Sequence, residues 1–402
     1  MDVSAEHLLV IVLVAARRVS ATVAWLHPVQ GERVVAHRAI DCDWVELSEH
    51  GRRQVVAEAV RMASESAGVE PYSATIAMSD PSISSQLVTG FADLGEELVL
   101  TQAERQQALH RASHRATTTD REILHTVPVR WTVRGRGGER EVLDPVGERG
   151  SRLTGHMLLI TARSGYREEL ASYLDTCTLH VDQVIAPPLA LWHGIAGKLK
   201  RTGSSIVLDC GARHTAVIVS RRGRLLHIQT YPFGGDHLTE RIAEGLAVSF
   251  DQAETLKREL DCSVQGTASD MEGQQYLWRE VQERHRLLAP AARICHAQLR
   301  DFFQPIAHEL REQEFIGASG QVHLVGRGST LGGLPSVVRE AFALPVTLGT
   351  GSKDREPSAE LTDVMISGVV RLAAEERRRE LGRTPITGRL SRAWRWFTRP
   401  LE

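Results

Sequence analysis

The residues best suited to bind a ligand lie in one short loop in the second half of the chain. Asp209 ends a predicted strand, Gly211 and Ala212 lie in the turn that follows, and Thr215 begins the returning strand. Small turn residues let backbone N–H groups approach phosphate oxygens, and the carboxylate can hold Mg²⁺ through a water molecule. An aspartate followed by glycine is also ordinary turn chemistry, so this loop by itself does not separate a phosphate site from a plain hairpin.

Further glycines follow in the order that a nucleotide site requires. Gly234 and Gly235 precede a predicted helix, and Gly326 and Gly328 lie in a loop between a predicted strand and a predicted helix. Glycines at the positions of Gly326 and Gly328 permit a base and a ribose to lie against the backbone. The ordered combination predicts a nucleotide site better than any single loop does.

Two charged residues, Glu254 and Lys257, stand one turn apart on a predicted helix. Either side chain could reach the ribose or the adenine edge of a nucleotide. An opposite-charge pair at this spacing is also an ordinary surface pair, and the sequence leaves both interpretations open.

The elements that would position these residues are duplicated along the chain. Each half carries three predicted strands followed by a helix: 8–16, 20–26, 33–40 and 48–66 in the first, and 206–209, 215–220, 225–231 and the segment after Gly235 in the second. This duplication predicts an α/β fold in which two related domains, each a mixed sheet with helices, face each other across a cleft. Actin-like nucleotide-binding proteins have this arrangement.

Residues 80–162 depart from the repeat. They contain a predicted helix near 102–113 and predicted strands near 123–133 and 156–161, which indicates a small inserted α+β subdomain. The predicted domain boundaries are 1–79 and 163–200 for the first actin-like domain, 80–162 for the insert, 201–249 and 315–381 for the second domain, 250–314 for a helical cap on it, 382–388 for a linker and 389–402 for a terminal amphipathic helix.

The first half lacks the matching phosphate chemistry. In an intact actin-like site the first hairpin supplies an aspartate and a Gly-Thr or Gly-Ser turn, whereas residues 13–17 are Leu-Val-Ala-Ala-Arg. Without that acid a metal loses one partner, so the sequence predicts at most a weak ATPase. Arg17 or Arg18 could neutralise phosphate charge instead, or the site could be degenerate and empty.

The chain ends in an amphipathic segment. At about 100° per residue, its bulky apolar residues fall on one face of a helix and its arginines on the other, with Trp396 at the flank. This layout is typical of a helix that lies flat in the headgroup region of an anionic membrane, and the segment is too short to span it. The alternative is a final helix packed on the protein. The predicted membrane-binding residues are Leu390, Arg392, Trp394, Arg395, Trp396, Phe397 and Arg399.

Composition restricts the other functions. The 402 residues are 42% hydrophobic and 24% charged, with a net charge of -2, which gives no general reason to expect nucleic acid as a partner. Neither the five cysteines nor the seventeen histidines show a paired metal spacing, and the cysteines fit a reduced cytosol. No apolar stretch approaches the length of a transmembrane helix, and the charges around 8–16 are in the wrong order for an export signal.

Several motifs resemble the FtsA family of bacterial cell-division proteins. The most specific ones lie in the insert, and the loop around Gly326 resembles the family's adenosine loop with one glycine replaced. The resemblance runs from about residue 50 to the amphipathic tail. Its motifs are Asp120 to His125 with Val127-Pro128, Asp144 to Gly147, Gly150 to Leu153, Tyr231 to Thr239 and Gly326 to Ser329.

The resemblance implies an actin-like fold with the insert as the family's distinctive subdomain, ATP in the interdomain cleft, and self-assembly into filaments. It also implies a role at the division septum. The family's terminal helix anchors FtsZ to the inner face of the cytoplasmic membrane, and the protein helps to recruit later divisome proteins. The FtsZ tail usually docks on the subdomain that residues 250–314 would form.

Three other functions compete with this interpretation. A scaffold of another envelope machine, such as type IV pilus assembly, shares much of the fold but lacks this kind of lipid-binding tail. A sugar kinase needs an intact phosphate hairpin and a catalytic acid, which the first half does not supply. A diverged paralogue with a degenerate nucleotide site keeps fold and tail, and one sequence does not exclude it.

Overall fold

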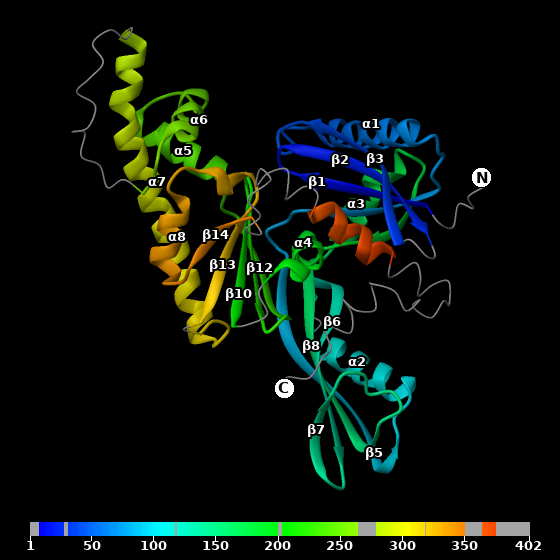
Figure 1. Ribbon diagram of the computed structural model, residues 1–402. Helices are drawn as coiled ribbons and strands as arrows, with labels where there is room; N and C mark the ends of the chain where they lie inside the picture. The colour runs from blue at the N-terminus through cyan, green and yellow to red at the C-terminus, as the bar shows by residue number, and fades with distance from the viewer. Residues whose placement is uncertain are drawn as a thin grey trace. The chain divides into compact units, whose positions relative to one another are not determined.

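The computed structural model describes residues 8–27, 31–116, 119–199, 203–263, 279–317, 319–349 and 364–374 (Figure 1). The chain forms two compact units. The first contains residues 1–199, 223–230 and 363–402, and the second contains residues 200–222 and 231–362. None of the described helices is both long enough and apolar enough to cross a membrane.

A five-stranded sheet with strand order β3-β2-β1-β4-β9 forms one part of the first unit. β1 is antiparallel to β2 and parallel to β4. The strands are β1 (Leu8–Ala15), β2 (Arg18–His27), β3 (Gly31–Asp41), β4 (Ser73–Met78) and β9 (His180–Val184), and the helices of this part are α1 (Glu49–Ala67), α3 (Tyr166–Asp175), α4 (Pro187–Ile195) and the 3-10 turn η2 (Ala196–Lys198).

Both faces of this sheet are covered, because successive side chains of a strand point to opposite faces. Leu9 and Ile11 of β1 pack with α4 and with the helix formed by residues 364–374. α1 contacts β2 and β3 and also α3. It begins at Ser48, whose side chain accepts a hydrogen bond from the Gly51 N–H, and it ends at Gly68 with φ of 66°. A sheet buried on both sides explains the near-continuous apolar run of β1.

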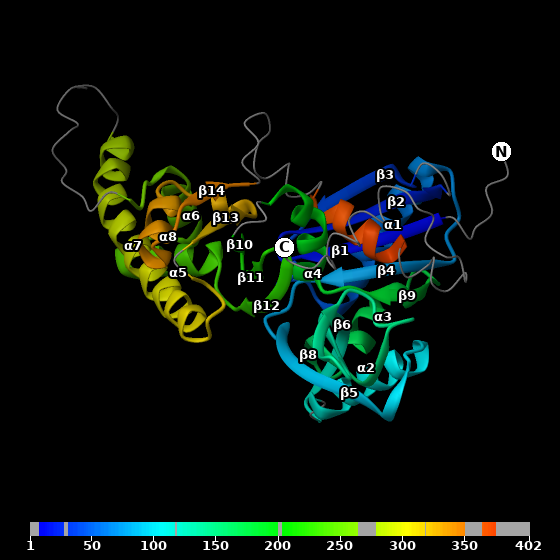
Figure 2. The ribbon, with the colours of Figure 1, turned by 60° about the horizontal axis from the view of Figure 1, so that its bottom comes forward.

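A second sheet of the first unit is formed by the insert together with β12, and one helix covers it. Its strand order is β12-β5-β8-β6-β7, and α2 lies against β5 and β8 (Figure 1, Figure 2). Gly90 permits this close approach, because a Cβ there would lie 2.0 Å from the Ala108 carbonyl oxygen. The elements are β5 (Ser84–Val99), α2 (Gln102–Ala116), β6 (Arg121–Gly135), β7 (Gly138–Val142), β8 (Arg149–Arg163) and β12 (Arg224–Tyr231).

The second unit repeats the pairing of the first. β10 is antiparallel to β11 and parallel to β13, as β1 is to β2 and β4, and the strand order here is β14-β13-β10-β11. Four helices pack with this sheet in one apolar core. The elements are β10 (Ser204–Cys210), β11 (Thr215–Arg221), α5 (Gly235–Leu246), α6 (Phe250–Glu259), α7 (Arg279–Glu312), β13 (Gly320–Val325), the 3-10 turn η3 (Arg327–Thr330), α8 (Leu334–Phe342) and β14 (Val346–Leu348).

The predicted fold class is confirmed. Each unit has a mixed sheet with helices, the strand pairing is duplicated, and a small α+β subdomain is inserted in the first unit. The predicted terminal helix, 389–402, lies outside the described residues. The predicted domain boundaries stay predictions.

Candidate functional site

The loop singled out by sequence is a tight hairpin turn in the second unit. β10 and β11 pair up to Cys210 opposite Thr215, and the Gly211 N–H donates to the His214 carbonyl at 2.9 Å. A Cβ on Gly211 would lie 2.8 Å from that same carbonyl oxygen, which is why a glycine closes the turn. At the tip of the turn, the N–H groups of Ala212 and Arg213 donate to no residue that the structure describes. They remain available to an anion.

The start of α5 packs directly on this turn. The Gly235 N–H donates to the Gly211 carbonyl at 3.0 Å, and the Asp236 N–H donates to the Ala212 carbonyl at 2.7 Å. A Cβ on Gly234 would lie 2.5 Å from the Ala212 carbonyl oxygen, so the contact needs a glycine there. The Thr215 hydroxyl donates to the Phe233 carbonyl at 2.8 Å, which ties the returning strand to the segment before the helix.

The loop after β13 lies against the other side of the hairpin. Gly326 has φ of 88°, and a Cβ there would lie 2.4 Å from the Cys210 carbonyl oxygen and 2.6 Å from Asp209 Oδ1. A Cβ on Gly328 would lie 2.8 Å from the same carbonyl oxygen. The buried Ser329 hydroxyl donates to the Gly326 carbonyl at 2.6 Å and holds the loop in this form. The structure therefore brings together the glycine loops that the sequence singled out.

Asp209 is the uncompensated charge of this site. Burial raises its pKa from 3.8 to about 6, because its surroundings replace water around the carboxylate. No side chain or N–H group among the described residues donates to it, while the residue keeps partial access to solvent. A carboxylate in this condition fits a hydrated cation, since the cation would offset the lost solvation.

An ion pair that the sequence analysis missed lies beside the turn. Arg213 Nε is 3.1 Å from Asp236 Oδ2, and the Asp236 side chain is 7% exposed. An acidic residue in the first turn of a helix is a common sequence signal. Its pairing with Arg213 depends on how the helix packs on the hairpin, so the pair could not be predicted from residue types alone. The pair places a guanidinium next to the free N–H groups of the turn.

Glu254 and Lys257 are paired with each other and with the start of α5. Lys257 Nζ is 2.5 Å from Glu254 Oε2, 2.8 Å from the Thr239 hydroxyl and 3.0 Å from the Gly235 carbonyl oxygen. The lysine side chain is 12% exposed. The two residues thus attach α6 to the start of α5, at Gly235 and Thr239. Their contact with a ribose or adenine stays a prediction.

The arginines of the first hairpin have carboxylate partners within the first unit. Arg17 Nη1 is 2.5 Å from Asp43 Oδ2, and Arg18 Nε is 2.6 Å from Asp41 Oδ1. These ion pairs join the β1–β2 turn to the end of β3. A phosphate that used either arginine would have to compete with its carboxylate.

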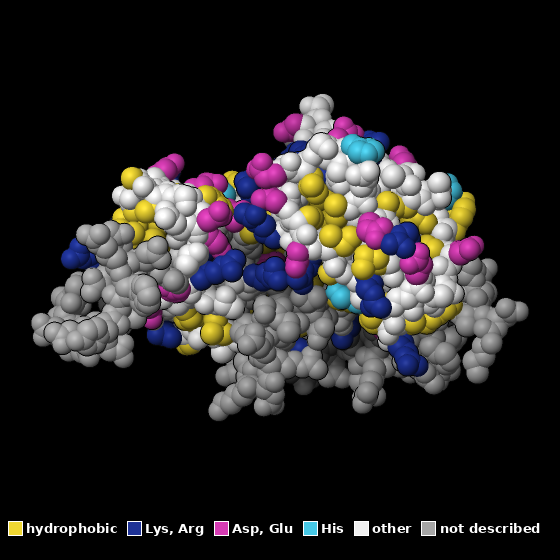
Figure 3. All heavy atoms as spheres, turned by 90° about the horizontal axis from the view of Figure 1, so that it is seen from above, with side chains coloured by type: hydrophobic (Ala, Val, Ile, Leu, Met, Phe, Trp, Pro, Cys, Tyr) yellow, Lys and Arg dark blue, Asp and Glu magenta, His cyan; other side chains and the backbone are white. Residues whose placement is uncertain are grey.

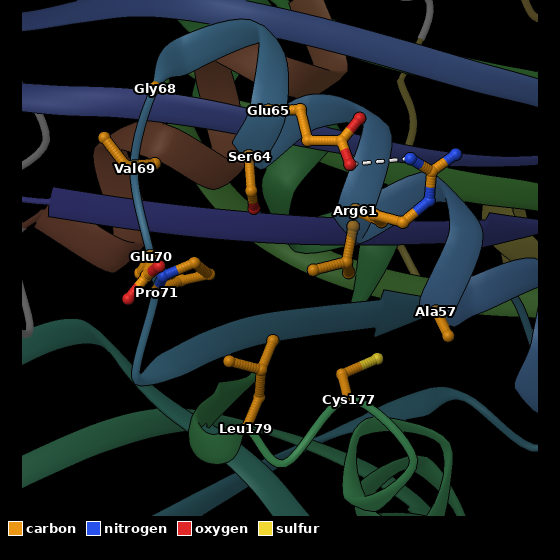
Figure 4. Close-up of a pocket in the computed structure, with 11 residues that line it drawn as sticks. Ala57, Arg61, Ser64, Glu65, Gly68, Val69, Glu70, Pro71, Cys177 and Leu179 are labelled. Carbon is orange, nitrogen blue, oxygen red and sulfur yellow. Dashed lines mark hydrogen bonds and ion pairs between the residues drawn. The ribbon is translucent and has the colours of Figure 1, made fainter.

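A pocket of about 500 Å³ lies elsewhere in the first unit (Figure 4). α1 forms one side of it, and the segment Val69–Pro71 together with Cys177 and Leu179 forms the other. Arg61 and Glu65 form an ion pair of 2.6 Å at its rim. The pocket contains none of the glycine loops, so it is not the predicted nucleotide site.

Other classes of site find less support. No group of three His, Cys, Asp or Glu residues suited to a metal occurs within the described ranges. Lys and Arg side chains lie beside Asp and Glu side chains on the face seen in Figure 3, as the near-neutral net charge leads one to expect. The predicted membrane-binding residues, 390–399, lie outside the part of the chain that the structure describes.

Comparison with protein families matches two parts of the chain. Residues 206–367 match the model described as cell division protein FtsA, and residues 81–161 match the model described as SHS2 domain inserted in FTSA. The second match covers the insert, and the first covers the hairpin, α5 and the loop after β13.

Curated relatives agree with these matches. The chain is 28% identical over 306 residues to cell division protein FtsA of Rhizobium meliloti (strain 1021), covering 73% of this chain and 67% of the relative. It is 25% identical over 294 residues to the protein of that name from Streptococcus pneumoniae serotype 2, covering 73% and 64%. The match therefore spans about two thirds of the length of these relatives.

A solved structure has a related fold. It is described as the PilM-PilN type IV pilus biogenesis complex, and the likeness has a TM-score of 0.59, a sequence identity of 15% and a coverage of 92% of this chain and 98% of that one. At this identity the likeness concerns the fold alone.

Proposed function

This chain belongs to the FtsA family of cell-division proteins, and on that premise we propose that it tethers FtsZ to the inner face of the cytoplasmic membrane at the division septum. The observation that carries the proposal is the pair of family matches, because the inserted subdomain and the second unit match models of one family independently. The proposal includes recruitment of later divisome proteins.

The membrane contact rests on the pattern of residues 389–402. Bulky apolar residues on one helical face and arginines on the other suit a helix lying in the headgroup region. Arginines near an anionic surface each contribute about 1 kcal/mol. We propose that this segment binds anionic membrane lipid. Tethering of FtsZ then requires both the segment and the folded units.

The helical part of the second unit is the proposed docking surface for FtsZ. α6 and α7 belong to residues 250–314, which the family resemblance assigns to this role. Phe250, at the start of α6, is 39% exposed, so a large apolar side chain is available to a partner. Polymerisation of the chain with copies of itself completes the proposal.

The hairpin site of the second unit is the proposed position of ATP and Mg²⁺. The free N–H groups of Ala212 and Arg213 would bind phosphate oxygens, and Asp209 would hold Mg²⁺ through water. Mg²⁺ would supply charge neutralisation for the phosphates. The first hairpin offers no carboxylate at the matching position, so binding with little or no hydrolysis is the expected behaviour.

Calorimetry of Mg-ATP binding tests the nucleotide proposal. The parent should bind, and Asp209→Ala should weaken binding, whereas Glu240→Gln on the exposed side of α5 should leave it unchanged. A parent chain that shows no binding would make the hairpin a pseudo-site. The tether proposal would stand in that case, since it does not depend on the nucleotide.

Flotation on anionic vesicles tests the tether. Purified FtsZ would be mixed with the full chain or with a chain that ends at Thr387. We expect FtsZ to float with the full chain and not with the chain that ends at Thr387. Flotation of the full chain without FtsZ would instead favour a scaffold of another envelope machine or a diverged paralogue.

A further inference from the structure

Two histidines stand together on the exposed side of the insert's helix. His110 and His114 of α2 are one turn apart, and both are exposed, so the expectation that the histidines show no paired metal spacing was wrong for these two. Their Nε2 atoms lie 3.0 Å apart, and their ring centroids lie 4.2 Å apart. The two rings therefore present nitrogen atoms to the same point in solvent.

The packing of α2 fixes this orientation. Ala108 and Ala112 are fully buried against the sheet of the insert. Each histidine follows one of these alanines by two positions, or about 200° around the helix axis, so it lies on the side of the helix opposite the sheet. Arg111 is drawn away from the histidines, since its guanidinium lies 4.9 Å from the centroid of the Phe91 ring and donates to the Phe91 carbonyl at 3.1 Å.

The separation of the nitrogens suits a metal ion. Two imidazoles bound at about 2.05 Å are about 2.9 Å apart at a right angle and about 3.3 Å apart at a tetrahedral angle. The observed 3.0 Å lies near the right-angle value, which square-planar and octahedral ions adopt. Without a metal, one Nε2 must carry a proton and the other must accept it, and an ion would take the place of that shared proton.

We propose that His110 and His114 form a two-imidazole chelate for a divalent ion of the copper, nickel and zinc series, with Cu²⁺ bound most tightly. Water fills the remaining coordination positions. The site lies on the insert, and it is independent of the nucleotide and membrane proposals, because it uses none of their residues.

Titration of Cu²⁺ into the full chain without an affinity tag tests the site. The chain has 17 histidines, so the decisive quantity is the difference between the parent and its variants. His110→Ala and His114→Ala should each lower the affinity of this site ~10-fold or more, because each leaves a single imidazole. Electron paramagnetic resonance of the parent complex should show two equivalent imidazole nitrogens, and each variant should show one.

His308→Ala is the matched control, since His308 is also an exposed helical histidine but its one-turn neighbour is Glu312. It should bind Cu²⁺ as the parent does. Alanine is the better helix former, so the two test variants should keep α2 folded, and circular dichroism checks this. Equal Cu²⁺ affinity in the parent and both test variants, or a parent spectrum with one nitrogen, would overturn the proposal.

Discussion

At the scale of single residues, Asp209 differs from the other charges around it. Arg213 is paired with Asp236, and Lys257 is paired with Glu254, so those charges are compensated within the protein. Asp209 has no such partner, and burial alone raises its pKa. An unpaired buried carboxylate destabilises a fold. We therefore expect the residue to cost stability in the absence of a bound cation.

Asp209→Asn should raise the free energy of unfolding at pH 7.5 by roughly 1–3 kcal/mol, because each pKa unit corresponds to about 1.36 kcal/mol and partial exposure reduces the effect. The folded-state pKa of Asp209, about 6, lies above its ordinary value of 3.8. At this carboxylate the folded state therefore binds more protons between these values, so the contribution of Asp209 to the stability of the parent falls as the pH rises through this window. Urea unfolding between about pH 4.5 and 7.5 measures both effects.

Glu240→Gln, at an exposed position of the same unit, should keep the parent's pH dependence. If Asp209→Asn has the stability and the pH slope of the parent, burial of the Asp209 carboxylate does not destabilise the free protein. Asp209 would then need no cation to offset its burial.

At the scale of elements, strands with a clear apolar pattern could be predicted and one without such a pattern could not. β1 and β10 are buried on both faces, and their near-continuous apolar runs identified them. β5 is sixteen residues long, but most of its side chains are exposed or half-buried, so its sequence shows no strand period. The glycine loops were predicted from residue types, whereas the Arg213–Asp236 pair arises from packing that one sequence does not reveal.

A histidine joins two elements of the first unit. His125 Nε2 in β6 accepts a hydrogen bond of 3.0 Å from the Ala186 N–H, which precedes α4. His125→Ala should lower the free energy of unfolding by about 1–3 kcal/mol, since it leaves that N–H without a partner. Burial lowers the pKa of His125 from 6.5 to about 3, and burial lowers the pKa of His193 to about 4.

The sign of the pH effect follows from these depressed values. Below about pH 6.5 the unfolded chain binds protons at these two histidines that the folded chain excludes, so their contribution to stability is complete above that pH and declines as the pH falls toward their folded-state pKa values of about 3 and about 4. His125→Ala should flatten this decline, and His308→Ala, at an exposed position, should not. Denaturant unfolding at several pH values is the measurement, and an unchanged acid slope in His125→Ala would contradict the assignment.

At the scale of the whole molecule, the proposed membrane location depends on a segment that lies outside the described residues. The described parts of the two units, the insert and the hairpin site lie within residues 8–374, whereas the proposed membrane contact lies in residues 389–402. Membrane binding and folding should therefore respond to different substitutions. A tail packed on the body would instead couple the two, and this difference separates the two interpretations of the tail.

Trp394→Glu combined with Phe397→Glu places two charges in the apolar stripe, and burying a charge at the acyl boundary is strongly unfavourable. The variant should keep the thermal stability of the parent and lose flotation on anionic vesicles. Trp394→Leu with Phe397→Leu is the matched control, since it keeps an apolar stripe and should still float. Vesicle binding by the glutamate variant at the parent level would exclude the tail as the anchor. A lower melting temperature in the glutamate variant would show instead that the stripe packs on the protein, because the charges would then disrupt a folded contact.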